Sequence, residues 1–357
     1  MIIYIISSSL GDGGSQRVLV NYANYLAKKK GYFVNFINLT KKNDYKGELI
    51  KKIKLIELKK SRAFFALFIL IKIFIKKRPD KIISSQTHIN FLTLFVSKIL
   101  FINKKNIFLR EVNTILFSHH SFLKKKALIF LFKFFYSRHN IICSSQGLGK
   151  EFKKINHKIN IKVIYLSIDE HDIIKKSNIS NKTIDYFKNK NYILYFGRIQ
   201  KHKGVLDLLK AFKLSKLTNL DLVFIGNGPE KRDLINHTIQ YNLVKKVYFM
   251  NFLKNPFPFV KNSRFCVLPS YHEGIPNVML QSIVLNKNII SYDCNYGPSE
   301  ILGKKSDLLV SVGNIKKLSE KIKFFSNKKK LYFNKRKILN KFENNRNLET
   351  LFEAIDE

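Results

Sequence analysis

Short β-branched runs alternate with longer segments of helical spacing along the whole chain. Five runs in the first half have the length and composition of buried strands, and they begin at Ile2, Phe33, Lys81, Ile107 and Ile141. The second half repeats this alternation with runs that begin at Tyr192, Asp221, Val247, Phe265 and Asn288. Strands that alternate with helices form parallel sheets through crossover connections. The pattern therefore predicts an α/β protein with two doubly wound parallel sheets.

A polar stretch from about 169 to 190 has little apolar periodicity and separates the two halves. We place an N-terminal domain at residues 1–170 and a C-terminal domain at residues 171–335. Each is long enough to bury its own core. The end of the chain, about 336–357, has a charged amphipathic pattern that predicts a helix packing back on the first domain.

The charge of the chain is strongly unbalanced. The sequence contains 65 Lys and Arg against 25 Asp and Glu, which gives a net charge of +40. Such a field attracts polyanions, including nucleic acid, anionic lipid head groups and phosphorylated small molecules. The chain is also crowded with Lys, Asn and Ile, so part of the excess reflects a compositional bias and a solvated lysine surface.

The cysteines and the N-terminus indicate a reduced, cytoplasmic protein. Cys143, Cys266 and Cys294 have no metal-ligand or redox spacing, which predicts reduced residues, two of them inside strand-like runs. The N-terminal run lacks a preceding basic region and leads into a Gly-rich turn. We therefore expect a first buried strand there and no signal peptide.

Two apolar stretches in the first half carry lysines at their ends or within them. They are AFFALFILI from Ala63 and the segment from Lys124 to Arg138. Neither reaches the ~18 apolar residues needed to span a bilayer. Each alone is compatible with a core helix, but two of them in a chain of this charge favour helices lying on an anionic membrane surface.

Loops that follow the strands carry the unusual residues, and in open α/β sheets ligands bind at those strand ends. After the first strand, Gly13 and Gly14 precede a helix, where backbone amides could approach a phosphate or a sugar. A tight turn explains these glycines equally well. The loop does not follow the GxGxxG pattern.

In the second half, Gly197 and Arg198 end one strand and Lys203 precedes the next helix. An Arg and a Lys at this spacing could clamp a diphosphate, although a pair of solvated charges is the alternative. Asn227 and Gly228 follow the next strand in a turn.

A third loop, PSYHEGIPNVMLQSI, places a carboxylate at a strand end. Glu273 would point toward a ligand, and Pro276 stands at the helix start. The amides of Gly274, Ile275 and Asn277 could meet an anion there. A surface glutamate beside a turn is the alternative, and its coincidence with the preceding loops argues against it.

These motifs, together with YGPSEIL, occur in an order and spacing that resemble glycosyltransferase family 4, retaining enzymes of the GT-B fold. The resemblance implies two Rossmann-like domains facing a central cleft that holds a nucleotide sugar, with no metal ion and no cofactor. It implies that Gly13 and Gly14 approach the phosphate and sugar of the donor and that Arg198 and Lys203 bind its diphosphate. It further implies that Glu273 hydrogen-bonds the transferred sugar.

One residue departs from the family pattern of two glutamates eight positions apart. Gln281 stands where the resemblance implies a second glutamate that binds the ribose hydroxyls. A glutamine keeps an acceptor oxygen but loses the strength of a charged hydrogen bond. We expect weaker or altered nucleotide binding with the chemistry retained, although an inactive paralogue is the alternative.

Candidate acceptor residues lie at strand ends of the first half. They are His88, Glu111 and Asn113, each able to bond an acceptor hydroxyl, and for His88 a packed or capping role is equally open. His119 and His120 have no partner at ligand spacing and are interpreted as surface residues.

We therefore expect a retaining, metal-independent glycosyltransferase that uses a UDP-sugar ahead of a GDP-sugar. The expected acceptor is lipid-linked or a surface polysaccharide, at the cytoplasmic face of the plasma membrane, to which the protein attaches peripherally. A sugar-nucleotide epimerase of the same fold is one alternative. A basic nucleic-acid-binding protein is another, but the sequence has no motif for specific nucleic-acid recognition.

Overall fold

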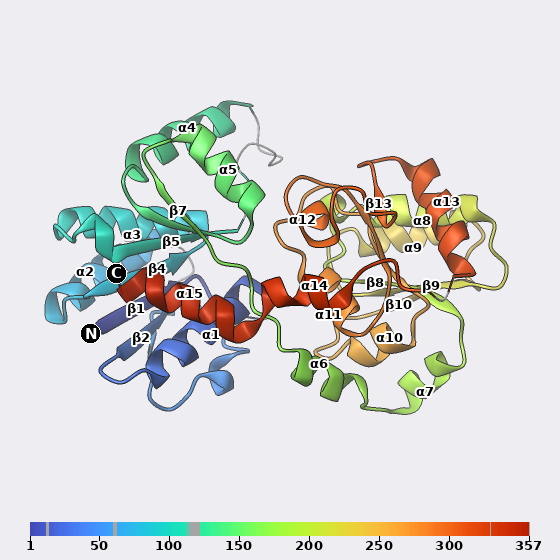
Figure 1. Cartoon of the computed structure of the whole chain (residues 1–357), viewed down its shortest axis with the longest axis horizontal. Coiled ribbons are helices and arrows are strands. Elements are labelled where there is room, and N and C mark those ends of the chain that lie inside the picture. Colours follow the sequence, from blue (N-terminus) through green and yellow to red (C-terminus); the bar gives the residue numbers. More distant parts are fainter. Residues whose placement is uncertain (12–13, 60–62, 113, 115–121, 329, 357) are drawn as a thin grey trace. The chain divides into compact units, whose positions relative to one another are not determined.

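The computed structural model describes residues 1–11, 14–59, 63–112, 114, 122–328 and 330–356. Its contacts divide the chain into two compact units. Unit 1 comprises Met1–Ser167 together with Asn344–Glu357, and unit 2 comprises Ile168–Glu343. Each contains a parallel sheet with helices packed against it (Figure 1). This confirms the predicted α/β class with two doubly wound sheets.

The sheet of unit 1 has, among the described residues, seven parallel strands in the order β3-β2-β1-β4-β5-β6-β7. The strands are β1 (Ile2–Ser7), β2 (Phe33–Asn38), β3 (Lys54–Glu57), β4 (Lys81–Ser85), β5 (Ile107–Glu111), β6 (Asn140–Cys143) and β7 (Asn160–Val163). The main helices are α1 (Gly14–Lys28), α2 (Leu67–Lys76), α3 (Thr87–Ile99), α4 (Phe122–Phe135), α5 (Gln146–Ile155) and α15 (Asn344–Asp356).

Side chains alternate between the two faces of the sheet along β1, and their contacts show which helices cover one of these faces. Tyr4 and Ile6 join a core cluster that includes Leu70 of α2, Leu92 of α3 and Phe132 of α4. Helices α2, α3 and α4 therefore cover one face together with α5. α1 packs against β1 and β2 and contacts α15.

The C-terminal segment differs from the single helix expected from residue 336. It forms α14 (Lys335–Leu339) and a 3₁₀ turn in unit 2, and then α15 in unit 1. Glu343 between them is extended, and the asparagines around it have low helix propensity. α15 is held to unit 1 by Tyr32, whose hydroxyl donates to Asp356 and whose ring lies 5.5 Å from that of Phe352.

Unit 2 has, in the part of the chain that is described, six parallel strands in the order β10-β9-β8-β11-β12-β13. They are β8 (Tyr192–Phe196), β9 (Asp221–Ile225), β10 (Val247–Met250), β11 (Cys266–Leu268), β12 (Ile289–Tyr292) and β13 (Leu309–Val310). Its main helices are α8 (Val205–Ser215), α9 (Lys231–Gln240), α10 (Phe257–Asn262), α11 (Asn277–Val284), α12 (Pro298–Leu302) and α13 (Ile315–Ser326).

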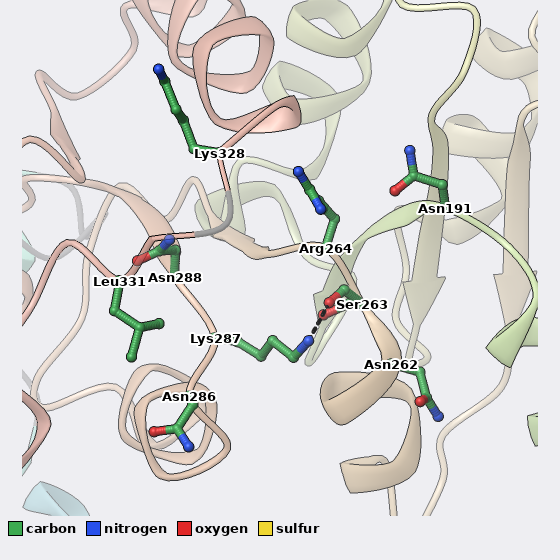
Figure 2. Close-up of a pocket in the computed structure, with 9 residues that line it drawn as sticks. All are labelled: Asn191, Asn262, Ser263, Arg264, Asn286, Lys287, Asn288, Lys328 and Leu331. Atoms are coloured by element: carbon green, nitrogen blue, oxygen red, sulfur yellow. Dashed lines mark hydrogen bonds between the residues drawn. The ribbon is translucent and has the colours of Figure 1, made fainter.

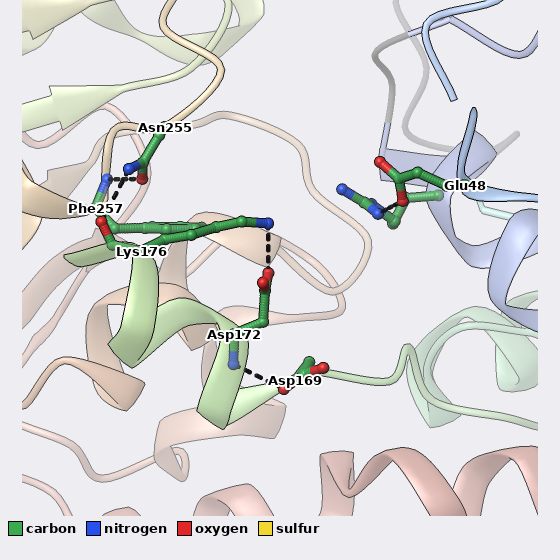
Figure 3. A network of polar contacts seen from close by, with 7 residues as sticks. Glu48, Asp169, Asp172, Lys176, Asn255 and Phe257 are labelled. Carbon is green, nitrogen blue, oxygen red and sulfur yellow. Dashed lines mark hydrogen bonds and ion pairs between the residues drawn. The ribbon is translucent and has the colours of Figure 1, made fainter. Parts of the chain in front are cut away.

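The polar stretch in which we placed the domain boundary forms two short helices of unit 2, α6 (Glu170–Ser177) and α7 (Lys182–Lys188). The Asp169 carboxylate caps α6 by accepting from the Asp172 amide at 2.9 Å, and Lys176 pairs with Asp172 at 2.6 Å (Figure 3). Asn255 donates to the Lys176 carbonyl at 2.8 Å and so ties α6 to the start of α10. Side-chain caps, which apolar periodicity does not register, hold these helices.

The three strands that periodicity did not predict are β3, β7 and β13. Each lies at a sheet edge and has at most four residues. An edge strand buries less apolar surface than a central one, so its sequence carries a weaker pattern. All three cysteines are buried with free thiols. Among the described residues, no helix combines the length and apolar character required to cross a bilayer.

Candidate functional site

The strand order in each sheet reverses next to its central strand. In unit 2 the reversal lies between β8 and β11, because β9 pairs on one side of β8 and β11 on the other. Loops that leave adjacent strands in opposite directions open a crevice at the carboxyl ends, where ligands bind. The loops after β8 and β11 carry Lys203 and Glu273.

Backbone contacts without intervening side chains hold these loops together. A Cβ on Gly228 would lie 1.9 Å from the carbonyl oxygen of Ile199, and a Cβ on Gly204 would lie 1.9 Å from that of Pro269. Any larger residue would therefore displace the neighbouring backbone. The amide of Tyr271 also donates to the carbonyl of His202 at 2.9 Å. The loops after β8, β9 and β11 thus form one packed backbone layer.

The side chains of Lys203 and Glu273, which belong to two of these loops, form an ion pair. The ammonium of Lys203 lies 2.6 Å from Oε1 of Glu273, and the side chains remain 21% and 11% exposed. The pair is therefore desolvated enough to strengthen its attraction and open enough to be reached by a ligand. The sequence assigned these residues to the same ligand, and the structure brings them together.

Glu273 also affects its buried neighbours. Burial, and next the charge of Glu273, raise the pKa of the Cys294 thiol to about 12. Burial and the same carboxylate raise the pKa of Tyr195. Cys294 is therefore a neutral packing residue beside the site. Tyr195 stays protonated, and its hydroxyl donates to the carbonyl of Arg198 at 2.6 Å.

A buried aspartate that the sequence analysis did not single out supports the Glu273 loop. Oδ2 of Asp207, in the first turn of α8, accepts from the hydroxyl of Tyr271 at 2.6 Å and from that of Tyr292 at 2.9 Å. Burial and the bond to Asp207 raise the pKa of Tyr271 to about 12. Tyr271 stands two residues before Glu273, so Asp207 positions that loop. A carboxylate on the apolar face of VLDLLKAF was the sequence signal for it.

The remaining residues of unit 2 that were predicted to contact the donor nucleotide sugar lie in the same loops or on α11. Arg198 and Asn227 are exposed, and Gly197 lies in the turn between β8 and Arg198. Gly274, Ile275 and Pro276 precede α11, which begins at Asn277, and Pro276 is its N-cap. Gln281 lies on α11 one turn after Asn277 and is partly exposed. Their contacts with a donor stay predictions.

Unit 1 places its strand-end residues differently. Gly14 is the exposed first residue of α1, while Gly13 lies outside the described residues. Beneath the start of α1, the buried Arg110 donates to Ser15 Oγ at 2.9 Å and to Ser85 Oγ at 3.3 Å. This guanidinium ties the first turn of α1 to the end of β4 from inside the unit.

The predicted acceptor residues do not share one environment. His88, in the first turn of α3, is exposed, and Asn113 lies outside the described residues, as do His119 and His120. Glu111 is buried, which differs from the expectation that it faces a ligand. Its carboxylate accepts from Thr87 at 2.9 Å and from Asn90 and Tyr136 at 2.7 Å each. Burial raises the pKa of Glu111 against the lowering effect of these bonds.

A polar pocket of about 310 Å³ in unit 2 involves none of the predicted site residues (Figure 2). Asn191, Arg264 and Asn288 line it and precede β8, β11 and β12, so it lies at the opposite ends of the strands from Glu273. Lys287 donates to the Ser263 carbonyl there at 2.7 Å, and burial lowers the pKa of Lys287. Within the described residues, no group of three or more His, Cys, Asp and Glu is arranged to hold a metal ion.

The second half of the chain is similar to a known protein family. Residues 177–346 match the family model described as glycosyl transferases group 1. A glycosyltransferase of Methanocaldococcus jannaschii with no characterised activity is 30% identical over 244 residues, which are 65% of this chain and 60% of that protein.

A second relative has a named activity. The Campylobacter jejuni N-acetylgalactosamine-N,N'-diacetylbacillosaminyl-diphospho-undecaprenol 4-alpha-N-acetylgalactosaminyltransferase is 27% identical over 243 residues, 66% of this chain and 63% of its own length. The chain thus covers less than two thirds of both relatives.

Solved structures with the same fold extend over both units. The crystal structure of Anabaena HepE in complex with UDP and glucose has a TM-score of 0.79 at 16% identity, covering 100% of this chain and 99% of that one. A glycosyltransferase of Rickettsia africae gives a TM-score of 0.78 at 16% identity, with 99% and 97% coverage. At this identity the likeness establishes the fold alone, which is that of two-domain glycosyltransferases.

Proposed function

We propose that the chain is a retaining glycosyltransferase that moves a sugar from a nucleoside diphosphate sugar to a hydroxyl group. The Lys203–Glu273 pair is the observation that carries this proposal. A cation that can receive a diphosphate and a carboxylate that can hold a sugar hydroxyl lie together at the switch point of unit 2. The match of residues 177–346 to group 1 glycosyl transferases supports it.

In the proposed step, the bond between the sugar C1 and the diphosphate oxygen breaks, and its electron pair stays on the leaving diphosphate. The acceptor oxygen forms a bond to C1 on the same face, and its proton passes to the departing phosphate. Fixed positive charge then stabilises the leaving group. Lys203, Arg198 and the amides before α11 supply this charge, so we expect no requirement for a divalent metal ion. Glu273 moves from Lys203 to a hydroxyl of the sugar when the donor binds.

We propose a UDP-sugar as donor and a lipid-linked or surface-polysaccharide acceptor, handled at the cytoplasmic face of the plasma membrane. The Anabaena structure with UDP supports the base, and the Campylobacter relative, named for a diphospho-undecaprenol substrate, supports the acceptor class. Gln281 in place of a glutamate predicts a weaker bond to the ribose. His88 is retained as an acceptor contact because it is exposed at a strand end.

The first test uses the purified full chain with a panel of nucleoside diphosphates and nucleotide sugars. A ligand that binds the folded form raises its melting temperature, so we expect UDP or a UDP-sugar to do so in the presence of excess EDTA. Donor turnover should fall by roughly 100-fold or more in Glu273→Gln and in Lys203→Ala. Lys317→Ala, which breaks an exposed pair with Glu320 elsewhere in unit 2, is the matched control and should keep wild-type turnover.

Wild-type turnover in both site variants would refute the assignment. So would a chain whose melting temperature responds to no nucleoside diphosphate. Formation of an epimeric UDP-sugar without any acceptor would assign the site to epimerisation in place of transfer.

A further inference from the structure

We propose that the outward faces of α2, α3 and α4 form a docking surface for an anionic lipid bilayer. We name this surface the α2–α4 face and define its apolar part by Phe68, Ile75, Phe95, Phe101, Phe130 and Phe134. The inference deepens the proposed membrane location and rests on it, but it is independent of the chemistry at Glu273. Figure 1 labels the three helices, all of which belong to unit 1.

Large apolar side chains project into solvent from all three helices. Phe68 and Ile75 of α2 are 67% and 68% exposed, and Phe130 and Phe134 of α4 are 67% and 61% exposed. The inward faces of the same helices already fill the core through Leu70 and Phe132. Single exposed apolar residues are common, but a set of them on neighbouring helices marks an interaction site.

Contacts between the helices make these residues one surface. The ammonium of Lys98 on α3 lies 5.2 Å from the ring centre of Phe134 on α4. Helix α2 also contacts α3, and Arg78, two residues after α2, donates to the carbonyl of Phe101, two residues after α3, at 3.3 Å. The apolar side chains of α2 and α4 therefore flank those of α3.

The cations of this surface stand between its apolar side chains. On α2, Lys72 is exposed four residues after Phe68, and on α4, Lys126 and Lys133 share the exposed face with Phe130. Helices α2, α3 and α4 contain no acidic residue.

The acidic residues that lie near these helices in the sequence are bonded to other groups or buried. Between residues 58 and 150 the sequence has Asp80 and Glu111 as its acids. The Asp80 carboxylate accepts from the amide of Ile2, and Glu111 is buried. The α2–α4 face is therefore positive throughout its described part.

A bilayer with anionic head groups matches both properties of this face. Phenylalanines can enter the boundary between head groups and acyl chains, while the lysines extend to the lipid phosphates. Nucleic acid would bind the lysines but leave the apolar side chains in water. A second copy of the face would bring lysines against lysines. We therefore assign the face to lipid.

The experiment measures binding of the full chain to vesicles of phosphatidylcholine with and without phosphatidylglycerol, by co-sedimentation at two salt concentrations. The test variant is the triple substitution Phe68→Ser, Phe95→Ser and Phe130→Ser. The matched control removes three similarly exposed apolar residues of unit 2, through Leu214→Ser, Ile239→Ser and Val244→Ser. The melting temperature with and without UDP confirms that each variant is folded and reports the donor site separately.

We expect the wild type and the control to bind vesicles containing phosphatidylglycerol, with part of the binding resistant to salt. The test variant should bind roughly tenfold or more weakly, with an unchanged response to UDP. Equal binding by the test variant and the wild type would overturn the proposal, because attraction would then come from charge alone. A wild-type dimer that the test variant converts to a monomer would also overturn it. Failure of the UDP response in the wild type would instead contradict the proposed function.

Discussion

Charged residues follow the central strands in both units, but the two units use them in opposite ways. In unit 2, Glu273 and Lys203 pair at the surface of the loops after β11 and β8. In unit 1, Arg110 and Glu111 end β5 with buried side chains, which the Ser15 hydroxyl of α1 and the Asn90 amide of α3 bind. The same topology thus yields an accessible charge pair in one unit and a buried support in the other.

The difference follows from what holds the loops. In unit 2 the glycines let backbone pack on backbone, so side chains are not needed inside the loop layer and can face a ligand. In unit 1 the start of α3 is joined to the end of β5 through Thr87 and Asn90, which need a buried acceptor such as Glu111. In this chain, the charged residues near strand ends are accessible where backbone packing supports the loops and buried where side chains do so.

The largest effect is expected from Gly228→Ala, which tests whether unit 2 needs its packed backbone layer. Its new Cβ would lie 1.9 Å from the Ile199 carbonyl oxygen, so unit 2 must distort or fail to fold. We expect a loss of more than about 4 kcal/mol in the free energy of unfolding. Gly47→Ala is the control, because a Cβ there meets nothing within 4 Å. Thermal unfolding followed by circular dichroism measures both, and equal melting temperatures would show that the backbone layer is not needed.

A second change tests the buried support in unit 1. Glu111→Ala leaves the donors of Thr87, Asn90 and Tyr136 unpaired and should reduce stability by about 2–5 kcal/mol. Donor binding should stay unchanged in the protein that remains folded, as measured by calorimetric titration with UDP. Glu273→Gln should show the reverse, with stability within about 1 kcal/mol of wild type and little turnover. Loss of turnover without loss of stability in Glu111→Ala would place Glu111 in acceptor binding after all.

The pH dependence of the same residue gives a third test. Burial raises the pKa of Glu111, so the folded chain keeps this proton to higher pH than the unfolded chain. Its contribution is full below the unfolded pKa and declines as the pH rises through the folded pKa. The wild type should therefore lose stability relative to Glu111→Gln as the pH rises above about 4, the ordinary pKa of a glutamate. Urea unfolding at several pH values measures this, and a difference independent of pH would contradict it.

The smallest expected effect concerns the positioning of Glu273. Tyr271→Phe and Tyr292→Phe each remove one hydroxyl from Asp207, at a cost of about 1 kcal/mol. Only Tyr271 lies in the Glu273 loop, so we expect turnover to fall roughly threefold to tenfold in Tyr271→Phe and to stay near wild type in Tyr292→Phe. UDP affinity should be equal in the two variants. An equal fall of turnover in both would mean that Asp207 acts on the site through stability alone.

The sequence was informative wherever a pattern is local. Buried central strands carry continuous apolar runs, so those beginning near Tyr192, Asp221 and Phe265 could be predicted, and with them the loops that bear Lys203 and Glu273. The sequence did not predict elements whose stability comes from residues remote in the chain. The edge strand Lys54–Glu57 forms because β2 offers it hydrogen bonds, and α6 is held in place by Asn255, which is remote in the sequence.

The sequence by itself determined the parallel two-unit architecture and the order of the loops at the strand ends. Only the tertiary structure decided which of their side chains are buried and which remain accessible. Glu273 and Glu111 both occur at the ends of apolar strands, and nothing local distinguishes them. Hydrogen bonds from Asn90 of α3 and from Tyr136 hold Glu111 in the core. Glu273 instead forms an ion pair with Lys203 that remains partly exposed. The direction of a side chain depends on the partners that other strands and helices bring to it.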